Sequence, residues 1–217
     1  FERKWIYRSN DYLTLVNSLI RSNLFFSTQY PIRRVNSIYF DSNNYSSIRQ
    51  NLDGISEKKK IRIRWYGTQN KLIEPMLEIK SKKGSETKKE VYKINELNDL
   101  KFPDSKNLKI IKDIVNFKVK TKNVINPMLT TNYDRQYFIS SNNRVRATVD
   151  YKLKSIYLKN LSQLDIIKNF SFVCVLELKY STNLDKYVRQ NLKKITLRLS
   201  KNSKYINSAF ETPVFLS

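Results

Sequence analysis

Lysine and arginine recur at alternate positions in several short segments of the chain, and this spacing suits the binding of a polyanion. The clearest case is KIRIR at 60–64. Shorter segments of the same kind are EIK at 78–80, RVRATVD at 144–150 and ELK at 177–179. Successive side chains of a β-strand point to opposite faces, so each segment would carry one charged and one apolar face. Several such strands in a closed sheet would line a cavity with cations.

The overall charge supports an anionic partner. The 217 residues contain 41 Lys and Arg against 19 Asp and Glu, a formal net charge of +22. A charge of this size is typical of proteins that meet nucleic acid, a membrane surface or phosphate chains. Hydrophobic residues make up 40% and aromatic residues 12% of the chain, which is enough for a folded core.

Two absences exclude whole classes of active site. The chain has no histidine, which excludes a Ser-His pair, a histidine general base and a histidine metal site. Its one cysteine, Cys174, excludes an internal disulfide and a cysteine-cluster zinc site. A metal here would need oxygen ligands, which favours Mg²⁺ or Mn²⁺. No apolar run approaches the roughly 20 residues of a membrane span, and we expect a cytoplasmic protein.

Hydrophobic periodicity predicts about eight strands, a few helices and one domain over residues 1–217. The predicted strands are 2–7, 35–40, 59–66, 76–82, 87–94, 128–139, 144–158 and 171–180. The predicted helices are 11–23, 45–52, 108–117 and 184–209, the last with a break near residue 200. Lys83-Gly84 predicts a hairpin between the fourth and fifth strands.

These segments, taken in order, resemble the vacuolar transporter chaperone (VTC) polyphosphate polymerase domain, a branch of the triphosphate tunnel metalloenzymes. The resemblance covers nearly the whole chain, and KIRIRWYG at 60–67 is its closest match. The other matching segments are FERK at 1–4, VNSIYFD at 35–41, LEIK at 77–80, YDR at 133–135, RVR at 144–146, LELK at 176–179 and SKY at 203–205.

The resemblance implies an α+β fold with a closed eight-stranded antiparallel β-barrel. The barrel interior would be polar and basic, and helices near 11–23, 108–117 and 184–196 would cover its apolar outer surface. In this fold the barrel forms a tunnel that binds triphosphate.

The resemblance also implies roles for individual residues. The catalytic cations would be Arg62, Arg64, Lys80, Arg135, Arg146, Lys179 and Lys204. Further phosphate contacts would come from Lys4, Lys60, Lys88 and Lys201, with Lys88 preferred over Lys89. Glu177 would bind the metal, and Glu2 and Glu78 would either assist it or orient the neighbouring lysines.

The implied activity is that of an ATP-dependent polyphosphate polymerase that uses Mn²⁺ or Mg²⁺, with ATP and inorganic polyphosphate or pyrophosphate as partners. A tunnel-fold triphosphatase or polyphosphatase is one alternative. A non-enzymatic nucleic-acid binder is another, supported by the charge and the interleaved aromatic residues. No helix-turn-helix, zinc-finger or RNA-recognition signature accompanies it, so no specific nucleic acid is expected. The sequence does not identify a membrane partner protein.

Each candidate also has a purely structural interpretation. Arg62 and Arg64 could face solvent, and the pairs Glu78–Lys80 and Glu177–Lys179 could be ordinary ion pairs worth roughly 0.2–1 kcal/mol. Tyr39 and Trp65 are expected to be packing residues.

Overall fold

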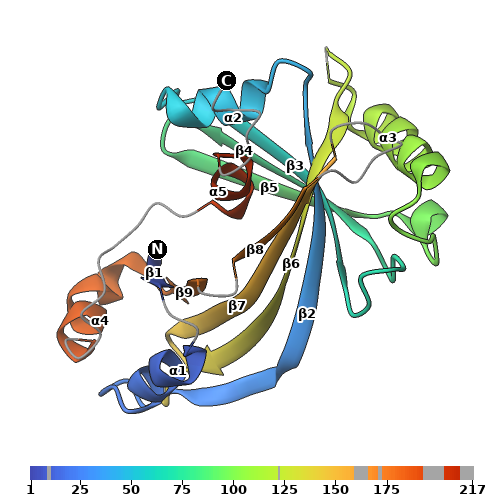
Figure 1. The fold of residues 1–217 in the computed structure, drawn as a ribbon. Coiled ribbons are helices and arrows are strands. Elements are labelled where there is room, and N and C mark those ends of the chain that lie inside the picture. The colour runs from blue at the N-terminus through green and yellow to red at the C-terminus, as the bar shows by residue number, and fades with distance from the viewer. Residues whose placement is uncertain (9–10, 122, 159–165, 171–172, 193–202, 211–217) are drawn as a thin grey trace. The chain divides into compact units, whose positions relative to one another are not determined.

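The computed structural model describes residues 1–8, 11–121, 123–158, 166–170, 173–192 and 203–210, with the side chains of 166–170 and 210 left out. Its strands (Figure 1) are β1 Glu2–Arg8, β2 Ser27–Asp41, β3 Lys58–Tyr66, β4 Met76–Lys83, β5 Glu86–Lys93, β6 Asn126–Ile139, β7 Arg146–Tyr157, β8 Ile166–Phe170 and β9 Val173–Lys179. Its α-helices are α1 Tyr12–Ile20, α2 Ser46–Leu52, α3 Ser105–Val119, α4 Asp185–Asn191 and α5 Lys204–Phe210. Short 3-10 helices span Asn95–Leu97 and Thr182–Leu184.

The strands form one sheet in the order β1-β9-β7-β6-β2-β3-β4-β5, and β8 pairs with β7. Strand β1 with β9, β2 with β3, β3 with β4, β4 with β5 and β7 with β9 all pair antiparallel, as the sequence predicted. The expected closed barrel is wrong for the described residues, because the strand order is an open path that ends at β1 and β5. Strand β5 has the character of an edge, since it is rich in Lys and Glu and almost wholly exposed.

By its internal contacts the chain divides into two compact units. Unit 1 comprises Phe1–Arg34, Tyr133–Lys154 and Asn169–Ser203. Unit 2 comprises Val35–Asn132, Ser155–Lys168 and Lys204–Ser217. The long strands β2, β6 and β7 run from one unit into the other.

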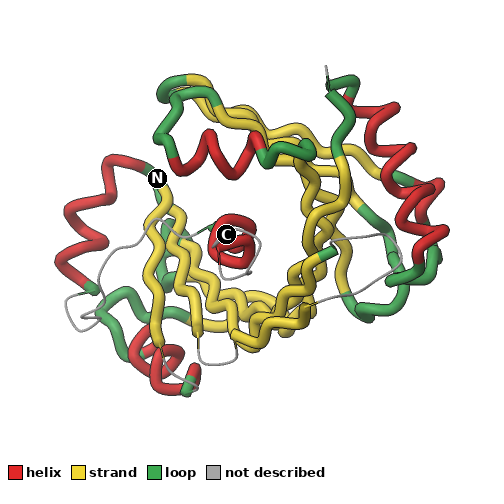
Figure 2. Tube along the Cα trace, turned by 45° about the horizontal axis from the view of Figure 1, so that its top comes forward, coloured by secondary structure: helices red, strands yellow, loops and turns green. Residues whose placement is uncertain are grey.

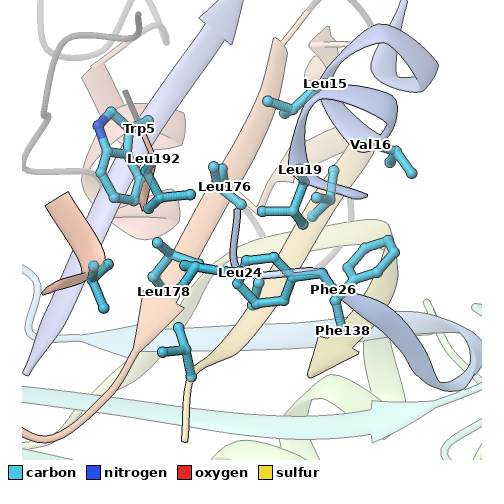
Figure 3. Packing of buried hydrophobic residues seen from close by; sticks show 14 of the residues in the cluster. Trp5, Leu15, Val16, Leu19, Leu24, Phe26, Phe138, Leu176, Leu178 and Leu192 are labelled. Atoms are coloured by element: carbon cyan, nitrogen blue, oxygen red, sulfur yellow. The ribbon is translucent and has the colours of Figure 1, made fainter. Parts of the chain in front are cut away.

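The core of unit 1 lies between helices α1 and α4 and the apolar face of the sheet. Leu15 and Leu19 of α1 and Val188 of α4 are buried with Leu176 and Leu178 of β9. Figure 3 shows this packing, with Trp5 of β1 beside Leu192. The alternate residues of β9, Val175, Glu177 and Lys179, belong to the opposite face. The two helices therefore cover the apolar face of the sheet, as expected. Glu177 and Lys179 lie on the opposite face, which these helices do not cover.

The core of unit 2 is built in the same way by α3. Leu108, Ile111 and Val115 of α3 pack with Ile61 and Ile63 of β3. Figure 2 shows α3 as the long helix beside the strands of this unit. This confirms the prediction of a covering helix at 108–117.

The hairpin between β4 and β5 turns where the sequence predicted it. Lys83 pairs with Glu86, so Gly84 and Ser85 form a two-residue loop. Gly84 has a φ of +58°, a conformation that glycine adopts without strain and that two-residue hairpins require.

No helix of the described residues is both long enough and apolar enough to cross a membrane.

The N-terminus of α3 gives a test of the fold. Asp104 caps the helix by accepting a hydrogen bond from the backbone N–H of Asn107 at 3.0 Å. Replacing Asp104 with alanine removes this acceptor and is expected to lower the free energy of unfolding by about 1 kcal/mol, measured by urea denaturation. Asp113→Ala on the same helix removes an equal charge but no cap, and should not destabilise the protein. Equal losses in the two variants would contradict the capping role.

Candidate phosphate-binding site

One cluster of candidate phosphate-binding residues lies on the polar face of β3, β4 and β5 in unit 2. Arg62 of β3 lies directly opposite Glu78 of β4. Arg62 donates to Glu78 Oε2 from Nε at 2.9 Å and from Nη2 at 2.6 Å. Arg64 Nη2 lies 2.5 Å from Glu78 Oε1, and Lys89 Nζ of β5 lies 3.0 Å from the same oxygen. Three cations therefore gather around one carboxylate.

Glu78 is ionised and organises these cations. Its side chain is 4% exposed, and this burial alone would raise its pKa. Arg62 and Arg64 outweigh the burial and hold the pKa at about 2. Both carboxylate oxygens are occupied by arginine and lysine donors. Glu78 therefore contacts the cations that it was expected to orient, and its alternative role in assisting a metal stays a prediction.

A row of lysines crosses the same face. Lys60 of β3 is paired with Lys80 of β4, and Lys80 is paired with Lys89 of β5. Like charges at directly opposite positions destabilise a sheet. The charge of Lys89 is partly compensated by Glu78. The cluster of Lys60, Arg62, Arg64, Glu78, Lys80 and Lys89, which we call the β3–β5 cluster, thus carries an excess of positive charge.

The preference for Lys88 over Lys89 is corrected by the register of β5. Lys88 lies opposite Ser81, which is on the other face of β4 from Glu78 and Lys80. Its ammonium group is 3.4 Å from Glu90. Alternation along β5 therefore puts Lys89, and not Lys88, in the β3–β5 cluster.

The second cluster lies on the polar face of β1, β9 and β7 in unit 1. Lys4 of β1 is paired with Glu177 of β9, and Glu2 is paired with Lys179. Lys4 Nζ lies 2.5 Å from Glu2 Oε1 and 3.3 Å from Glu177 Oε2. Lys179 Nζ lies 3.0 Å from Glu177 Oε1. Arg146 of β7 is exposed and directly opposite Lys179.

Glu177 is the buried carboxylate of this second cluster. Burial would raise its pKa, but Lys4, Lys179 and Arg135 lower it to about 2. Its side chain is 10% exposed, so the charge is held in partly desolvated surroundings. An ionised carboxylate of this kind is a suitable oxygen donor for a hard divalent cation.

Arg135 belongs to this side of the sheet but is already engaged. Its Nε and Nη2 donate to the two oxygens of Asp150 at 2.6 and 2.8 Å. Asp150 is completely buried, so the pair is a bidentate ion pair of the strong kind. Burial opposes the charge of Arg135, yet Asp150 raises its pKa well above the usual value. The alternating pattern alone did not reveal this partner, although Asp150 ends the RVRATVD segment in phase with Arg146.

The last two expected cations lie near the C-terminus. Lys204 is the first residue of α5 and helps to lower the pKa of Tyr39 in β2, whose burial acts in the opposite direction. Lys201 lies outside the described residues.

The described residues contain no group of three Asp, Glu, Cys or His side chains that could hold a metal ion by themselves. Glu177 and Glu2 both contact Lys4 and are the carboxylates of the second cluster. A metal bound there would take its remaining ligands from phosphate oxygens and water, as Mg²⁺ commonly does. The donor set fits that arrangement.

Comparisons with solved structures agree with the fold. The chain is similar to a candidate adenylate cyclase from Bacillus halodurans, with 12% identity, a TM-score of 0.56 and coverage of 97% of this chain and 96% of that one. It is also similar to a candidate adenylate cyclase from Vibrio parahaemolyticus, with 13% identity, a TM-score of 0.51 and coverage of 96% and 98%. A candidate adenylyl cyclase from Hippeastrum, described as having a dominant triphosphatase activity, gives 14% identity, a TM-score of 0.53 and coverage of 98% and 97%.

No curated protein matches the chain. The family model of the VTC domain matches residues 2–210, which is nearly the whole sequence. This match and the order of the charged strands agree, and the chain belongs to the VTC domain family.

Proposed function

We propose that this VTC domain is an ATP-dependent polyphosphate polymerase. It transfers the γ-phosphoryl group of ATP to the end of an inorganic polyphosphate chain, and pyrophosphate is the shortest acceptor of that class. The bond between Pγ and the β,γ-bridging oxygen breaks, a terminal phosphate oxygen of the acceptor bonds to Pγ, and ADP leaves. A cytoplasmic setting, which provides ATP, is part of the proposal.

The observation that carries the proposal is the excess positive charge of the β3–β5 cluster. Lys60, Lys80 and Lys89 stand side by side on three adjacent strands. Next to them, Arg62 and Arg64 are both bonded to the buried Glu78, and the guanidinium group of an arginine carries five N–H donors. The Nε of Arg64 is buried and has no hydrogen-bond partner. A ligand with several phosphate groups would relieve the repulsion between the lysines and accept these N–H groups.

The chemistry suits residues of these types. Phosphoryl transfer requires in-line positioning and neutralisation of charge rather than a protein nucleophile. The arginine forks would hold nonbridging oxygens in fixed directions, while the lysines would act as point charges. A charge-assisted contact contributes a net ~1.5–3 kcal/mol, so several contacts on one triphosphate dominate its binding. The absence of histidine is compatible with this chemistry.

In the second cluster, Glu177 would hold a divalent cation, assisted by Glu2. When bound, Mn²⁺ or Mg²⁺ supplies neutralisation of charge on the phosphate oxygens. Lys4 and Lys179, which contact Glu177 at 3.3 and 3.0 Å, would orient its carboxylate and bind phosphate beside it.

A triphosphatase is the second candidate, and one observation favours it. The similar Hippeastrum protein is described as having a dominant triphosphatase activity. The same cations would then hold the triphosphate, while water would take the place of the polyphosphate acceptor. The two activities differ in the acceptor and therefore in the product, since one gives chains and the other gives free phosphate.

Incubating the purified protein with ATP and Mn²⁺ or Mg²⁺ tests the proposal. Polymerase activity predicts ADP together with chains that appear as internal phosphate resonances by ³¹P NMR and as a ladder on a gel. Orthophosphate without chains would establish the triphosphatase instead. If ATP stays intact with both metals and the protein binds nucleic acid with an affinity that falls steeply with salt, both enzymatic functions are rejected. The protein would then be a non-enzymatic polyanion binder.

Two neighbouring lysines provide a matched test of which face of β5 is used. Lys89→Ala should raise the KM for ATP about tenfold, because it removes a cation from the β3–β5 cluster and a loss of about 1.4 kcal/mol is tenfold. Lys88→Ala removes the same charge from the opposite face and should change the KM less than twofold. The reverse order would show that phosphate binds on the other side of the sheet.

A further inference from the structure

Two short segments that lie far apart in the sequence, YFD at 39–41 and SKY at 203–205, meet in unit 2. Tyr205 of α5 donates a hydrogen bond from its hydroxyl to Asp41 Oδ2 at 2.7 Å. The rings of Tyr39 and Tyr205 are stacked, with centroids 5.0 Å apart and planes at 23°. Tyr39, Asp41 and Tyr205 are each no more than 2% exposed. Asp41 and Tyr205 are 164 residues apart in sequence, and with Tyr39 they form a buried cluster.

Both carboxylate oxygens of Asp41 accept hydrogen bonds in this cluster. Its Oδ1 accepts from the backbone N–H of Ser42 at 2.8 Å and of Ser47 at 2.9 Å. Its Oδ2 accepts from the backbone N–H of Ile48 at 3.3 Å in addition to the Tyr205 hydroxyl. Burial and the neighbouring Asp41 carboxylate raise the pKa of Tyr205, so the hydroxyl keeps its proton and donates. A single carboxylate thus ties α5 to the end of β2 and to the start of α2.

The two rings also contact the cations of the β3–β5 cluster. Lys60 Nζ lies 4.9 Å from the centroid of the Tyr39 ring and 5.7 Å from that of Tyr205. Both distances are within the range of a cation–π interaction. The hydroxyl of Tyr39 accepts a hydrogen bond from Arg62 Nη1 at 3.2 Å. Although burial would raise the pKa of Tyr39, Arg62, Lys60 and Lys204 lower it to about 7.

We propose that Tyr39 and Tyr205, held in place by Asp41, form an aromatic platform that positions Lys60 and Arg62 for the anionic ligand. These three are positioning residues, because they act through the two cations. The identity of the ligand rests on the proposed function. The way in which the two cations are held rests on the contacts described above. The platform also gives α5 a role, because this helix contributes the Tyr205 ring that lies near Lys60.

The same cluster offers a matched control. Tyr157 packs with Tyr39 and Tyr205 in one buried group, and its hydroxyl is 2.6 Å from that of Tyr45. The hydroxyl of Tyr157 thus pairs with Tyr45, whereas Tyr205 contacts both Asp41 and Lys60. Tyr157→Phe therefore removes a hydroxyl hydrogen bond from the same group without altering the platform. Tyr205→Leu removes the ring under Lys60, and Tyr205→Phe keeps the ring but removes the bond to Asp41.

Acetylation of individual lysines by an N-hydroxysuccinimide ester, followed by mass spectrometry, tests the platform directly. The ester reacts with the neutral amine, so a lysine held over two rings reacts slowly. Lys60 should be acetylated about three- to tenfold faster in Tyr205→Leu than in the wild type. The increase should be smaller in Tyr205→Phe and absent in Tyr157→Phe. Lys82, an exposed lysine of β4, serves as the internal standard.

Two results would overturn the platform: an unchanged Lys60 rate in Tyr205→Leu, or an equal increase in Tyr157→Phe, which would indicate general loosening. Kinetics then link the platform to the reaction, because Tyr205→Leu should raise the KM for ATP more than it lowers kcat. If the wild-type protein leaves ATP intact, the proposed function fails. The acetylation rates still decide the platform in that case, so the two failures are distinguishable.

Discussion

Replacing Arg62 with alanine is expected to lower kcat/KM for ATP by about 10²- to 10³-fold, measured as ADP release. Arg62 would stabilise charge that develops on the transferred phosphoryl group, and loss of one such donor typically costs about 2.7–4 kcal/mol. Arg62 is joined to Glu78 by two hydrogen bonds and to Tyr39 by a third. Its fork is therefore fixed before a ligand arrives, which is the property that makes a donor effective.

Two further variants separate this role from simple loss of charge. Arg62→Lys keeps the charge but loses the fork, and should recover only part of the activity. Arg49→Ala, at an exposed position of α2 in the same unit, removes one positive charge outside the cluster and should leave activity unchanged. If Arg62→Ala and Arg49→Ala behave alike at unchanged thermal stability, Arg62 does not contact the reacting phosphate.

The direction of the charged side chains could be predicted from the sequence because alternation is a local property. In KIRIR the buried residues are Ile61 and Ile63, while Lys60, Arg62 and Arg64 keep partial exposure on the other face. Once one face of a strand is apolar, helix α3 buries it and the register of the charges follows. The same reasoning placed Lys4, Glu177 and Lys179 on one face of β1 and β9.

Other features depend on pairing between distant segments and could not be predicted in this way. Strand β5 is exposed on both faces, so its sequence does not distinguish Lys88 from Lys89, and the pairing with β4 decides between them. Strand β2 begins at Ser27, whereas the sequence predicted a start at 35. The prediction missed the first half of the strand because that half has no buried face and so gives no periodic signal. Closure of a sheet depends on how its edge strands meet, and alternation along one strand contains no information about it.

The contacts of two buried carboxylates were also missed, for a physical reason. Asp41 and Asp150 are almost completely buried. Burial of a carboxylate is strongly unfavourable unless hydrogen-bond donors surround it, as they do here. Each of the two carboxylates accepts from a side chain of another segment: Tyr205 donates to Asp41, and Arg135 donates to Asp150. A local pattern identifies the charged residue but not its partner. Tyr39, expected to be a packing residue, contacts Arg62 and Lys60 for the same reason.

Replacing Glu177 with glutamine is expected to lower the metal-dependent rate about 100-fold and to raise the concentration of Mn²⁺ needed for half-maximal activity. The side chain keeps its shape but loses the charge that would hold the cation, and a bound Mg²⁺ or Mn²⁺ depends on one or two carboxylates. The magnitude follows the losses typical of altered metal sites. Initial rates measured across a titration of Mn²⁺ at saturating ATP give both quantities.

The metal titration also distinguishes two roles for Glu177. Its oxygens contact Lys4 and Lys179, so the substitution could act by releasing these lysines rather than by losing the metal. If the rate falls but the half-maximal Mn²⁺ concentration is unchanged, Glu177 is a positioning residue and the metal is bound elsewhere. Glu2→Gln is the matched control, because it removes the other carboxylate on Lys4 from a more exposed position, with 35% of its side chain exposed against 10% for Glu177. A metal ligand at Glu177 requires its variant to shift the titration further than the Glu2 variant does.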